Sequence, residues 1–401
     1  MEATTNNRKE RKYFIDWLRI GLIISVFFFH VGMIFRPEHW HVNSEETFAF
    51  LDPIMWWLHL WRMPLLFLVS GIGTYYALGR RTSWQYVKER FRRLYIPFAA
   101  GFFLLVPVQI YIERIDMYDS LWSFYPHMFD NGVYPVGNIS WHHLWFIVYL
   151  FLISMIVAPF LRFTKTAAYK KLRIRLISAM SRKLGLNWLL VVLIGSQWIL
   201  RQYWPDSTHA LLNDWAYFTY YMLFFISGFM LFTSDKLIGA LTRQRRLYLV
   251  QTLAFTVLLF TLRYILPPVE YLVDVAYGIT EITIALSCGL TAIGYFKAYF
   301  NKENRFRKIL NEAIYPFYLL HQPVLVVIGY IVLQWNISTG LQAILITLIS
   351  LVVIYVLYWY VIRRWNPLRL IFGLKMKMSK PATVEIPEES LQLQPVVERN
   401  D

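Results

Sequence analysis

The chain has 401 residues, of which 57% are hydrophobic and only 16% are charged, whereas a water-soluble domain carries about a quarter charged residues. This composition excludes an ordinary soluble protein. The net charge of +15 does not indicate nucleic-acid binding, because the Lys and Arg residues lie in short clusters between apolar runs.

Ten apolar runs are each about 20 residues long, which is the length of a helix that crosses the hydrocarbon core of a bilayer. A helix also satisfies every backbone amide within its own segment, as lipid requires. The sequence therefore predicts an all-α fold, a polytopic transmembrane helical bundle of about ten spans. The runs cover residues 14–35, 54–78, 94–113, 142–162, 186–204, 214–234, 246–266, 276–297, 310–335 and 341–362.

The basic residues orient these spans. With the N-terminus in the cytoplasm, 34 of the 40 Lys and Arg residues fall in predicted cytoplasmic segments, and only three fall in external loops. Because cytoplasmic loops carry an excess of Lys and Arg, both termini are predicted to be cytoplasmic. The chain then divides into a cytoplasmic N-terminus (1–13), a membrane domain (14–365) and a tail (375–401) whose prolines and charges predict disorder.

The first predicted span carries Asp16, Arg19 and His30. On a helix, Arg19 and His30 lie about 20° apart around the axis and roughly 16 Å apart along it. Asp16 precedes Arg19 by three residues, which is close enough for the two side chains to pair. Two interpretations are open. The three residues form either a functional polar face through the bilayer, or an interfacial ion pair with a separate structural histidine.

The second span contains Arg62 and, two residues later, Pro64, which predicts a kink. Arg62 lies within the apolar run, so it must face protein or water. A structural ion pair and a substrate contact are both open for it, and Glu281 and Glu113 are the candidate partners.

The glycine-containing segments 67–71 and 225–228 look alike, and a packing contact between small residues explains both.

Arg90 and Arg93 follow the second span at a spacing of three residues, so on a helix they point the same way. Two guanidinium groups on one face suit phosphate oxygens. The alternative is that they serve only as a topology signal.

Further along the chain, His142 and His143 begin the fourth span and His321 lies within the ninth. No Cys or carboxylate stands at ligand spacing nearby, so we expect no metal site.

Together these residues resemble the membrane-bound acyltransferase-3 family, close to its glucan-modifying, succinyltransferase-like branch. The resemblance extends in order over residues 13–365. The matching elements are Asp16-Trp17-Leu18-Arg19 with His30, which fits the family's Arg-x10-His motif, then residues 67–71, the Arg90-x-x-Arg93 pair, His143-Leu144-Trp145-Phe146 and residues 315–321.

The resemblance implies an O-acyltransferase of the cell membrane, in bacteria the inner membrane. It would move an acetyl or succinyl group from cytoplasmic acyl-CoA to a hydroxyl of an extracytoplasmic glycan or similar acceptor. The candidate catalytic residues are then His30, Arg19 and Asp16, and Arg90 and Arg93 would meet the phosphates of acyl-CoA. The partners implied are the lipid bilayer and the glycan.

The polar face of the first span fits this implication. The head of acyl-CoA is anionic and would bind at the Arg-rich inner mouth, while its arm follows the face from Arg19 to His30. A neutral imidazole at His30 would act as a general base towards an acceptor hydroxyl or carry the acyl group itself. Two other classes remain open: a secondary transporter of a small anionic solute, and a structural or lipid-binding membrane protein.

Overall fold

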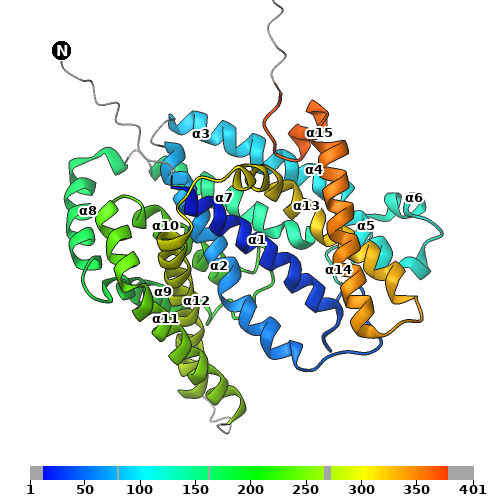
Figure 1. Cartoon of the computed structure of the whole chain (residues 1–401), viewed down its shortest axis with the longest axis horizontal. Coiled ribbons are helices and arrows are strands. Elements are labelled where there is room, and N and C mark those ends of the chain that lie inside the picture. Colours follow the sequence, from blue (N-terminus) through cyan, green and yellow to red (C-terminus); the bar gives the residue numbers. More distant parts are fainter. Residues whose placement is uncertain (1–11, 79–80, 161–162, 266–271, 378–401) are drawn as a thin grey trace, which may run out of the picture.

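The computed structural model describes residues 12–78, 81–160, 163–265 and 272–377. Within these residues the chain is helical and contains one isolated β-bridge but no strand (Figure 1). A helix covers most of each of the ten predicted apolar runs, so the all-α prediction is confirmed. The long helices are α1 (Tyr13–Ile34), α2 (Leu51–Leu78), α7 (Trp145–Phe160), α9 (Trp188–Leu200), α10 (Trp215–Leu231), α11 (Asp235–Tyr264), α12 (Leu272–Tyr299), α13 (Arg305–Leu333) and α14 (Thr339–Val356).

The third predicted span (94–113) and the segment before it are built from several shorter elements that follow one another. They are α3 (Ser83–Arg90), the π-helix η1 (Phe91–Tyr95), α4 (Ile96–Leu104) and α5 (Val106–Glu113). Short helices occupy the connections: η2 (Ile115–Met117), α6 (Leu121–Phe124), η3 (Tyr125–His127), η5 (Phe163–Lys165), α8 (Ala167–Met180) and, after the last span, α15 (Asn366–Ile371). The short helices η4 (His142–Leu144) and η6 (Gly185–Asn187) lead directly into α7 and α9, and the π-helix η7 (Leu357–Ile362) continues α14.

Seven of the described helical segments are long and apolar enough to cross a bilayer, so the chain is a multi-pass membrane protein. The helices α9 and α10 are apolar but shorter, and α2 carries Arg62 and other polar residues along its 28 residues. The total of about ten spans and the cytoplasmic placement of the termini stay predictions. Most of the predicted N-terminal segment 1–13 and of the tail 375–401 lies outside the described residues.

Polar contacts between distant helices agree with the predicted alternation of the spans. They join helix ends and loops that the sequence assigns to the same side of the membrane. On the predicted cytoplasmic side the pairs are Lys12–Asp235, Tyr13–Glu303 and Asp16–Arg307. On the predicted external side they are His41–Glu113, Glu46–Thr339 and Trp141–His209. In Figure 1 the loop between α1 and α2 lies at the end of the molecule opposite α3 and α15.

The glycine-containing segments of α2 and α10 pack directly against each other. A Cβ atom added at Gly71 would clash with the carbonyl oxygen of Phe225, and one added at Gly228 would clash with the carbonyl oxygen of Leu68. Only glycine permits helix backbones to approach this closely. The packing explanation of the two similar segments is therefore confirmed. The contact fixes α2, which carries Arg62, within the core of the bundle.

Candidate active site

A cavity of about 480 Å³ lies beside the end of α1 that is predicted to be external. Residues of α1, α2, η4, α7, α13 and the two loops 35–50 and 201–214, which are predicted to be external, line it. Its polar lining consists of four histidines, two arginines and one carboxylate, which are His30, His59, His143, His209, Arg36, Arg62 and Glu38. The structure therefore gathers around His30 several residues that are far apart in the sequence.

The hydrogen bonds around His30 define the protonation of its ring. Its Nδ1 lies 2.9 Å from the carbonyl oxygen of Val26 and 3.2 Å from Nε2 of His321 on α13. A carbonyl only accepts, so Nδ1 of His30 carries the proton. His321 likewise donates from Nδ1 to the carbonyl of Tyr318, which leaves its Nε2 as an acceptor for His30. The lone pair of neutral His30 is therefore on Nε2, for which the described residues provide no hydrogen-bond partner.

His143 and Tyr318 complete the wall behind this pair. The His143 Nε2 lies 3.1 Å from the carbonyl oxygen of Leu319, and the Tyr318 hydroxyl donates to the carbonyl of His143. The ring of His143 is 5.3 Å from that of His321 between centroids. These bonds tie η4 to α13. His143 and His321, which the sequence singled out in separate spans, thus belong to the same site as His30.

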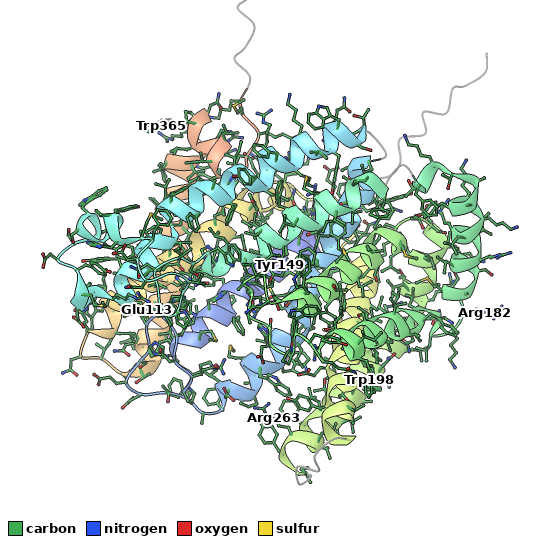
Figure 2. The ribbon with its side chains drawn as sticks, turned by 180° about the vertical axis from the view of Figure 1, so that it is seen from behind. Glu113, Tyr149, Arg182, Trp198, Arg263 and Trp365 are labelled. Atoms are coloured by element: carbon green, nitrogen blue, oxygen red, sulfur yellow. The ribbon has the colours of Figure 1, made fainter. Side chains whose placement is uncertain are left out.

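The loop 35–50, which is predicted to be external, contributes residues that the sequence did not indicate. The ring of Trp40 lies 5.7 Å from that of His30 between centroids. Its neighbour His41 donates from Nδ1 to Glu113 over 2.6 Å and accepts at Nε2 from Gln322 over 3.0 Å. Figure 2 labels Glu113 at the end of α5. No span or motif includes Trp40 or His41, so composition offered no signal for them.

His209 is a second cavity residue that the sequence analysis missed. Its ring stacks on Trp145 with 4.0 Å between centroids. The loop that carries it is held by Tyr149 of α7, labelled in Figure 2, whose hydroxyl donates to Asp214 and accepts from the amide of Leu211. Burial lowers the pKa of His209 to about 4, so its imidazole is neutral near pH 7.

Asp16 finds its ion-pair partner on another helix. The sequence placed Asp16 next to Arg19, and the charge of Asp16 does act on Arg19. The ion pair in the structure, however, joins Asp16 to Arg307 on α13, whose side chain is fully buried. This contact fixes the predicted cytoplasmic end of α1 against α13. It gives Asp16 a structural task besides the catalytic one that was expected of it.

Arg19 lies near both arginines that were expected to bind phosphate. The charges of Arg90 and Arg93 act on Arg19, and we call these three residues the arginine cluster. Arg90 donates to the Thr74 hydroxyl over 2.9 Å, while Arg93 is 3.3 Å from Glu89 and its side chain is 44% exposed. Arg93 stands on the π-helix η1, a type of distortion that is frequent at functional sites. The cluster is at the opposite end of α1 from His30.

Arg62 does not pair with either predicted carboxylate. Glu113 bonds to His41 and Tyr134, and Glu281 lies 3.7 Å from Arg201. The sequence prediction of a partner for Arg62 was therefore wrong, because both carboxylates meet closer donors from the external loops. Arg62 is instead buried with 3% exposure, and its guanidinium lies over the ring of Phe29 at 3.6 Å.

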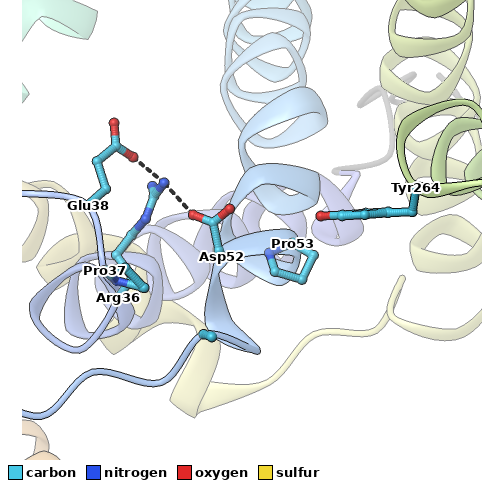
Figure 3. Close-up of a pocket in the computed structure, with 7 residues that line it drawn as sticks. Arg36, Pro37, Glu38, Asp52, Pro53 and Tyr264 are labelled. Atoms are coloured by element: carbon cyan, nitrogen blue, oxygen red, sulfur yellow. Dashed lines mark hydrogen bonds and ion pairs between the residues drawn. The ribbon is translucent and has the colours of Figure 1, made fainter. Parts of the chain in front are cut away.

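An open groove of about 720 Å³ adjoins the cavity on the predicted external face (Figure 3). Arg36 and Glu38 line both the groove and the cavity. Arg36 pairs with Glu38 and, over 2.7 Å, with Asp52, and Tyr264 stands at the far side of the groove. An ion-paired arginine thus stands between the open groove and the site around His30.

The described part of the chain contains no group of three or more His, Cys, Asp or Glu residues arranged to hold a metal ion. The site therefore offers imidazole, guanidinium and carboxylate groups for proton transfer and for binding of anions. It holds a histidine lone pair at one end of α1 and the arginine cluster at the other. About 16 Å of helix separate His30 from Arg19.

Comparison with known proteins is consistent with this arrangement. Residues 12–359 match a family model described as an acyltransferase domain. Two similar relatives are both named "Glucans biosynthesis protein C". The protein from Escherichia coli (strain K12) is 25% identical over 338 residues, which cover 80% of this chain and 83% of the relative. The protein from Salmonella typhimurium is 24% identical over 393 residues, which cover 94% and 98%. No solved structure matches the chain.

Proposed function

The chain belongs to the acyltransferase-3 family of membrane proteins, and we propose that it moves an acetyl or succinyl group from cytoplasmic acyl-CoA to a hydroxyl of an extracytoplasmic glycan. The single observation that carries this proposal is the position of two groups at opposite ends of α1, the arginine cluster and the neutral His30. The arginine cluster lies at its predicted cytoplasmic end, and the free lone pair of His30 faces a cavity at its predicted external end. The names of the relatives support a glucan as the acceptor.

Donor binding falls to the arginine cluster. Guanidinium groups bind phosphate through pairs of parallel hydrogen bonds, and acyl-CoA has several phosphate groups at one end. The buried hydroxyl of Tyr315, which has no hydrogen-bond partner among the described residues, lies within electrostatic range of Arg90 and Arg93 and is available to the same ligand. With the phosphates held there, the pantetheine arm reaches along α1 towards His30.

Transfer then needs one group that first accepts a proton from the acceptor and later donates it to the leaving group. The Nε2 of His30 takes the proton from the acceptor hydroxyl while the hydroxyl oxygen attacks the thioester carbon. Collapse of the tetrahedral intermediate breaks the C–S bond. The departing thiolate takes the proton back from His30, and the products are the glycan ester and free CoA. The Nε2 of His321 stabilises the imidazolium by accepting from its Nδ1.

The same lone pair of His30 also permits a covalent route. In that route Nε2 attacks the thioester carbon, the C–S bond breaks, and CoA leaves as the thiolate before the glycan arrives, while His30 becomes a cationic acyl-imidazolium that keeps its Nδ1 proton. The glycan hydroxyl then attacks the acyl carbon, the C–N bond breaks to release neutral His30, and the hydroxyl proton goes to the CoA thiolate or to water. The two routes are separated by mixing the protein with acyl-CoA that carries a labelled acyl group, without glycan, and then quenching the reaction chemically. Only the covalent route leaves the label bound to the protein.

The acceptor enters, in this account, through the open groove of Figure 3. Sugar hydroxyls bind to carboxylates and phenols by hydrogen bonds, and the groove offers Glu38, Asp52 and Tyr264. Movement of Arg36 away from Glu38 would open the groove to the cavity. A single sugar hydroxyl then reaches the Nε2 of His30.

Mass spectrometry of cell-envelope glycans tests the proposal. Glycans from cells that make the protein should carry an added acyl group, and glycans from cells that make His30→Ala should not. Equal amounts of both proteins in the membrane are the necessary control. Identical glycans with and without the wild-type protein would contradict the proposed function.

A further inference from the structure

Arg62 is the one charged group in the cavity lining whose charge is not neutralised in the structure. Arg36, the other arginine of the lining, pairs with Glu38 and Asp52. Among the described residues, no hydrogen bond or ion pair to Arg62 is found, and its Nε and Nη1 atoms are buried without a hydrogen-bond partner. Glu38 is the only carboxylate that lines the cavity, and its partner is Arg36.

An unpaired guanidinium at this depth is costly to the fold. Arginine stays protonated in proteins, so it cannot escape the cost of burial by losing its charge. Its position over the Phe29 ring compensates in part, because the face of an aromatic ring attracts a cation. The planar edges of the guanidinium, with their N–H donors, remain for a ligand. Charged residues within membrane spans usually mark such a functional site.

The ligand of Arg62 must lie close to the reacting atoms. Phe29, on which Arg62 rests, directly precedes His30 in α1, and the two rings are 5.4 Å apart between centroids. Arg62 and His30 line the same cavity of about 480 Å³. An anion bound to Arg62 is therefore part of the molecule that reacts at His30, or is bound directly beside it.

We propose that Arg62 binds the terminal carboxylate of a dicarboxylic acyl group and so makes the enzyme select a succinyl-type donor over an uncharged one. This inference rests on the proposed function. The thioester carbon of such a donor lies at His30, and a short chain of two methylene groups leads to the carboxylate at Arg62. His59, one helical turn before Arg62 on α2, also lines the cavity and offers a further ring nitrogen. The cavity then binds the two ends of the acyl group through two different side chains.

Two donors of equal chain length test this assignment. Succinyl-CoA and butyryl-CoA both carry four-carbon acyl groups, but only the former ends in a carboxylate. The full chain in nanodiscs should release CoA faster from succinyl-CoA, with glucan oligosaccharides as acceptor. In Arg62→Met, kcat/KM for succinyl-CoA should fall about tenfold to a hundredfold, as for loss of one charged hydrogen-bonded contact, while kcat/KM for butyryl-CoA should not fall. Arg62→Lys should retain part of the preference, because it keeps the charge.

Thermal stabilisation by each donor gives a readout that does not need turnover. In the wild type, succinyl-CoA should raise Tm more than butyryl-CoA does, and in Arg62→Met the two donors should raise it equally. The matched control is Arg369→Gln, since Arg369 is also buried but pairs with Glu312 at the opposite end of the bundle. This variant should have a lower Tm than the wild type, but succinyl-CoA should still raise its Tm more than butyryl-CoA does.

Each contrary result has its own meaning. Equal losses with both donors in Arg62→Met would overturn the inference, because they would assign Arg62 to the oxyanion of the transition state or to the fold. A wild type that prefers butyryl-CoA or acetyl-CoA in both assays would overturn it as well. If no donor supports transfer but succinyl-CoA still stabilises only the protein with Arg62, the carboxylate site stands and the proposed function fails.

Discussion

His321 Nε2 accepts the hydrogen bond from His30 Nδ1 at 3.2 Å, and this contact joins α13 to α1 at the wall of the cavity. The same N–H also donates to the Val26 carbonyl, which fixes the tautomer that leaves the Nε2 of His30 free for chemistry. His321 is therefore a positioning residue in this account, since its own Nε2 is occupied by His30. Replacing His321 therefore tests whether it orients the ring of His30 or only supports the fold.

We expect His30→Ala to lose transfer by about a hundredfold to ten-thousandfold, which is the usual contribution of a general base. His321→Leu should lower kcat by about tenfold to a hundredfold and leave KM for the donor unchanged, because it removes one hydrogen bond to a charged imidazolium. His321→Gln retains an acceptor oxygen and should recover part of kcat. Steady-state kinetics of the purified proteins measure both effects. If His321→Gln and His321→Leu are equally impaired, or if KM rises with them, the positioning role is wrong.

The double variant Arg90→Ala with Arg93→Ala should mainly weaken donor binding. A charged hydrogen bond to phosphate is worth about 1.5–3 kcal/mol, so the loss of two contacts should weaken affinity about tenfold to several thousandfold. Lys at both positions should rescue binding only in part.

Arg92 stands between them, is exposed, and forms no part of the cluster, so Arg92→Ala is the control. Calorimetry with acyl-CoA measures the affinity of correctly inserted protein. Unchanged affinity in the double variant would leave these arginines only a role in topology.

Breaking the Asp16–Arg307 ion pair should destabilise the protein, and replacing both residues should restore most of the stability. Asp16→Asn leaves the fully buried Arg307 without its counter-charge, which should cost about 3–5 kcal/mol of unfolding free energy. Adding Arg307→Gln removes the stranded charge and should restore most of the stability. Thermal unfolding in detergent measures this. Transfer activity should return with stability if the role of Asp16 is structural, whereas a double variant that is stable but inactive would show that Asp16 also acts in catalysis.

The contact between Gly71 and Phe225 makes Gly71→Ala destabilising, because the added methyl group must push α2 away from α10. Forced insertion of a methyl group into packed structure costs about 1–3 kcal/mol. Gly195→Ala on α9 is the control, since nothing lies within 4 Å of a Cβ added there. The two proteins should differ in Tm by several degrees. Equal Tm values would mean that α2 and α10 are not packed as closely as the structure has them.

The sequence predicted most of the fold because apolar length and local periodicity define it. Each of the ten runs is largely helical, and the small residues of α2 and α10 packed together as expected. The number of spans and the side of each terminus were read from charge and length alone, and those remain predictions. Short helices such as α6 escaped notice, since they lack the apolar length that marks a span.

The residues that the structure brings together at the candidate site were identified in part from the sequence, and their catalytic and binding roles stay predictions. His30 was identified because its spacing from Arg19 is visible within one helix, and Arg90 and Arg93 because they are neighbours. The partner of Asp16 was missed because Arg307 is 291 residues away in the chain, and spacing within one helix cannot indicate such a contact. His209 and Trp40 were missed because they lie in loops, where no periodicity marks the side chain that faces a cavity.

Transfer across a sealed membrane is the most direct test of the central claim that the donor and the acceptor bind at opposite ends of α1. The protein is inserted in one orientation into vesicles, with labelled acyl-CoA on the side of the arginine cluster and glucan oligosaccharides on the side of the groove. The account predicts that the label appears in the glucan across the membrane, and that His30→Ala vesicles with the same protein content show about a hundredfold to ten-thousandfold less label. Labelling that occurs only when donor and glucan share one side, or that is equal with His30→Ala, would contradict it.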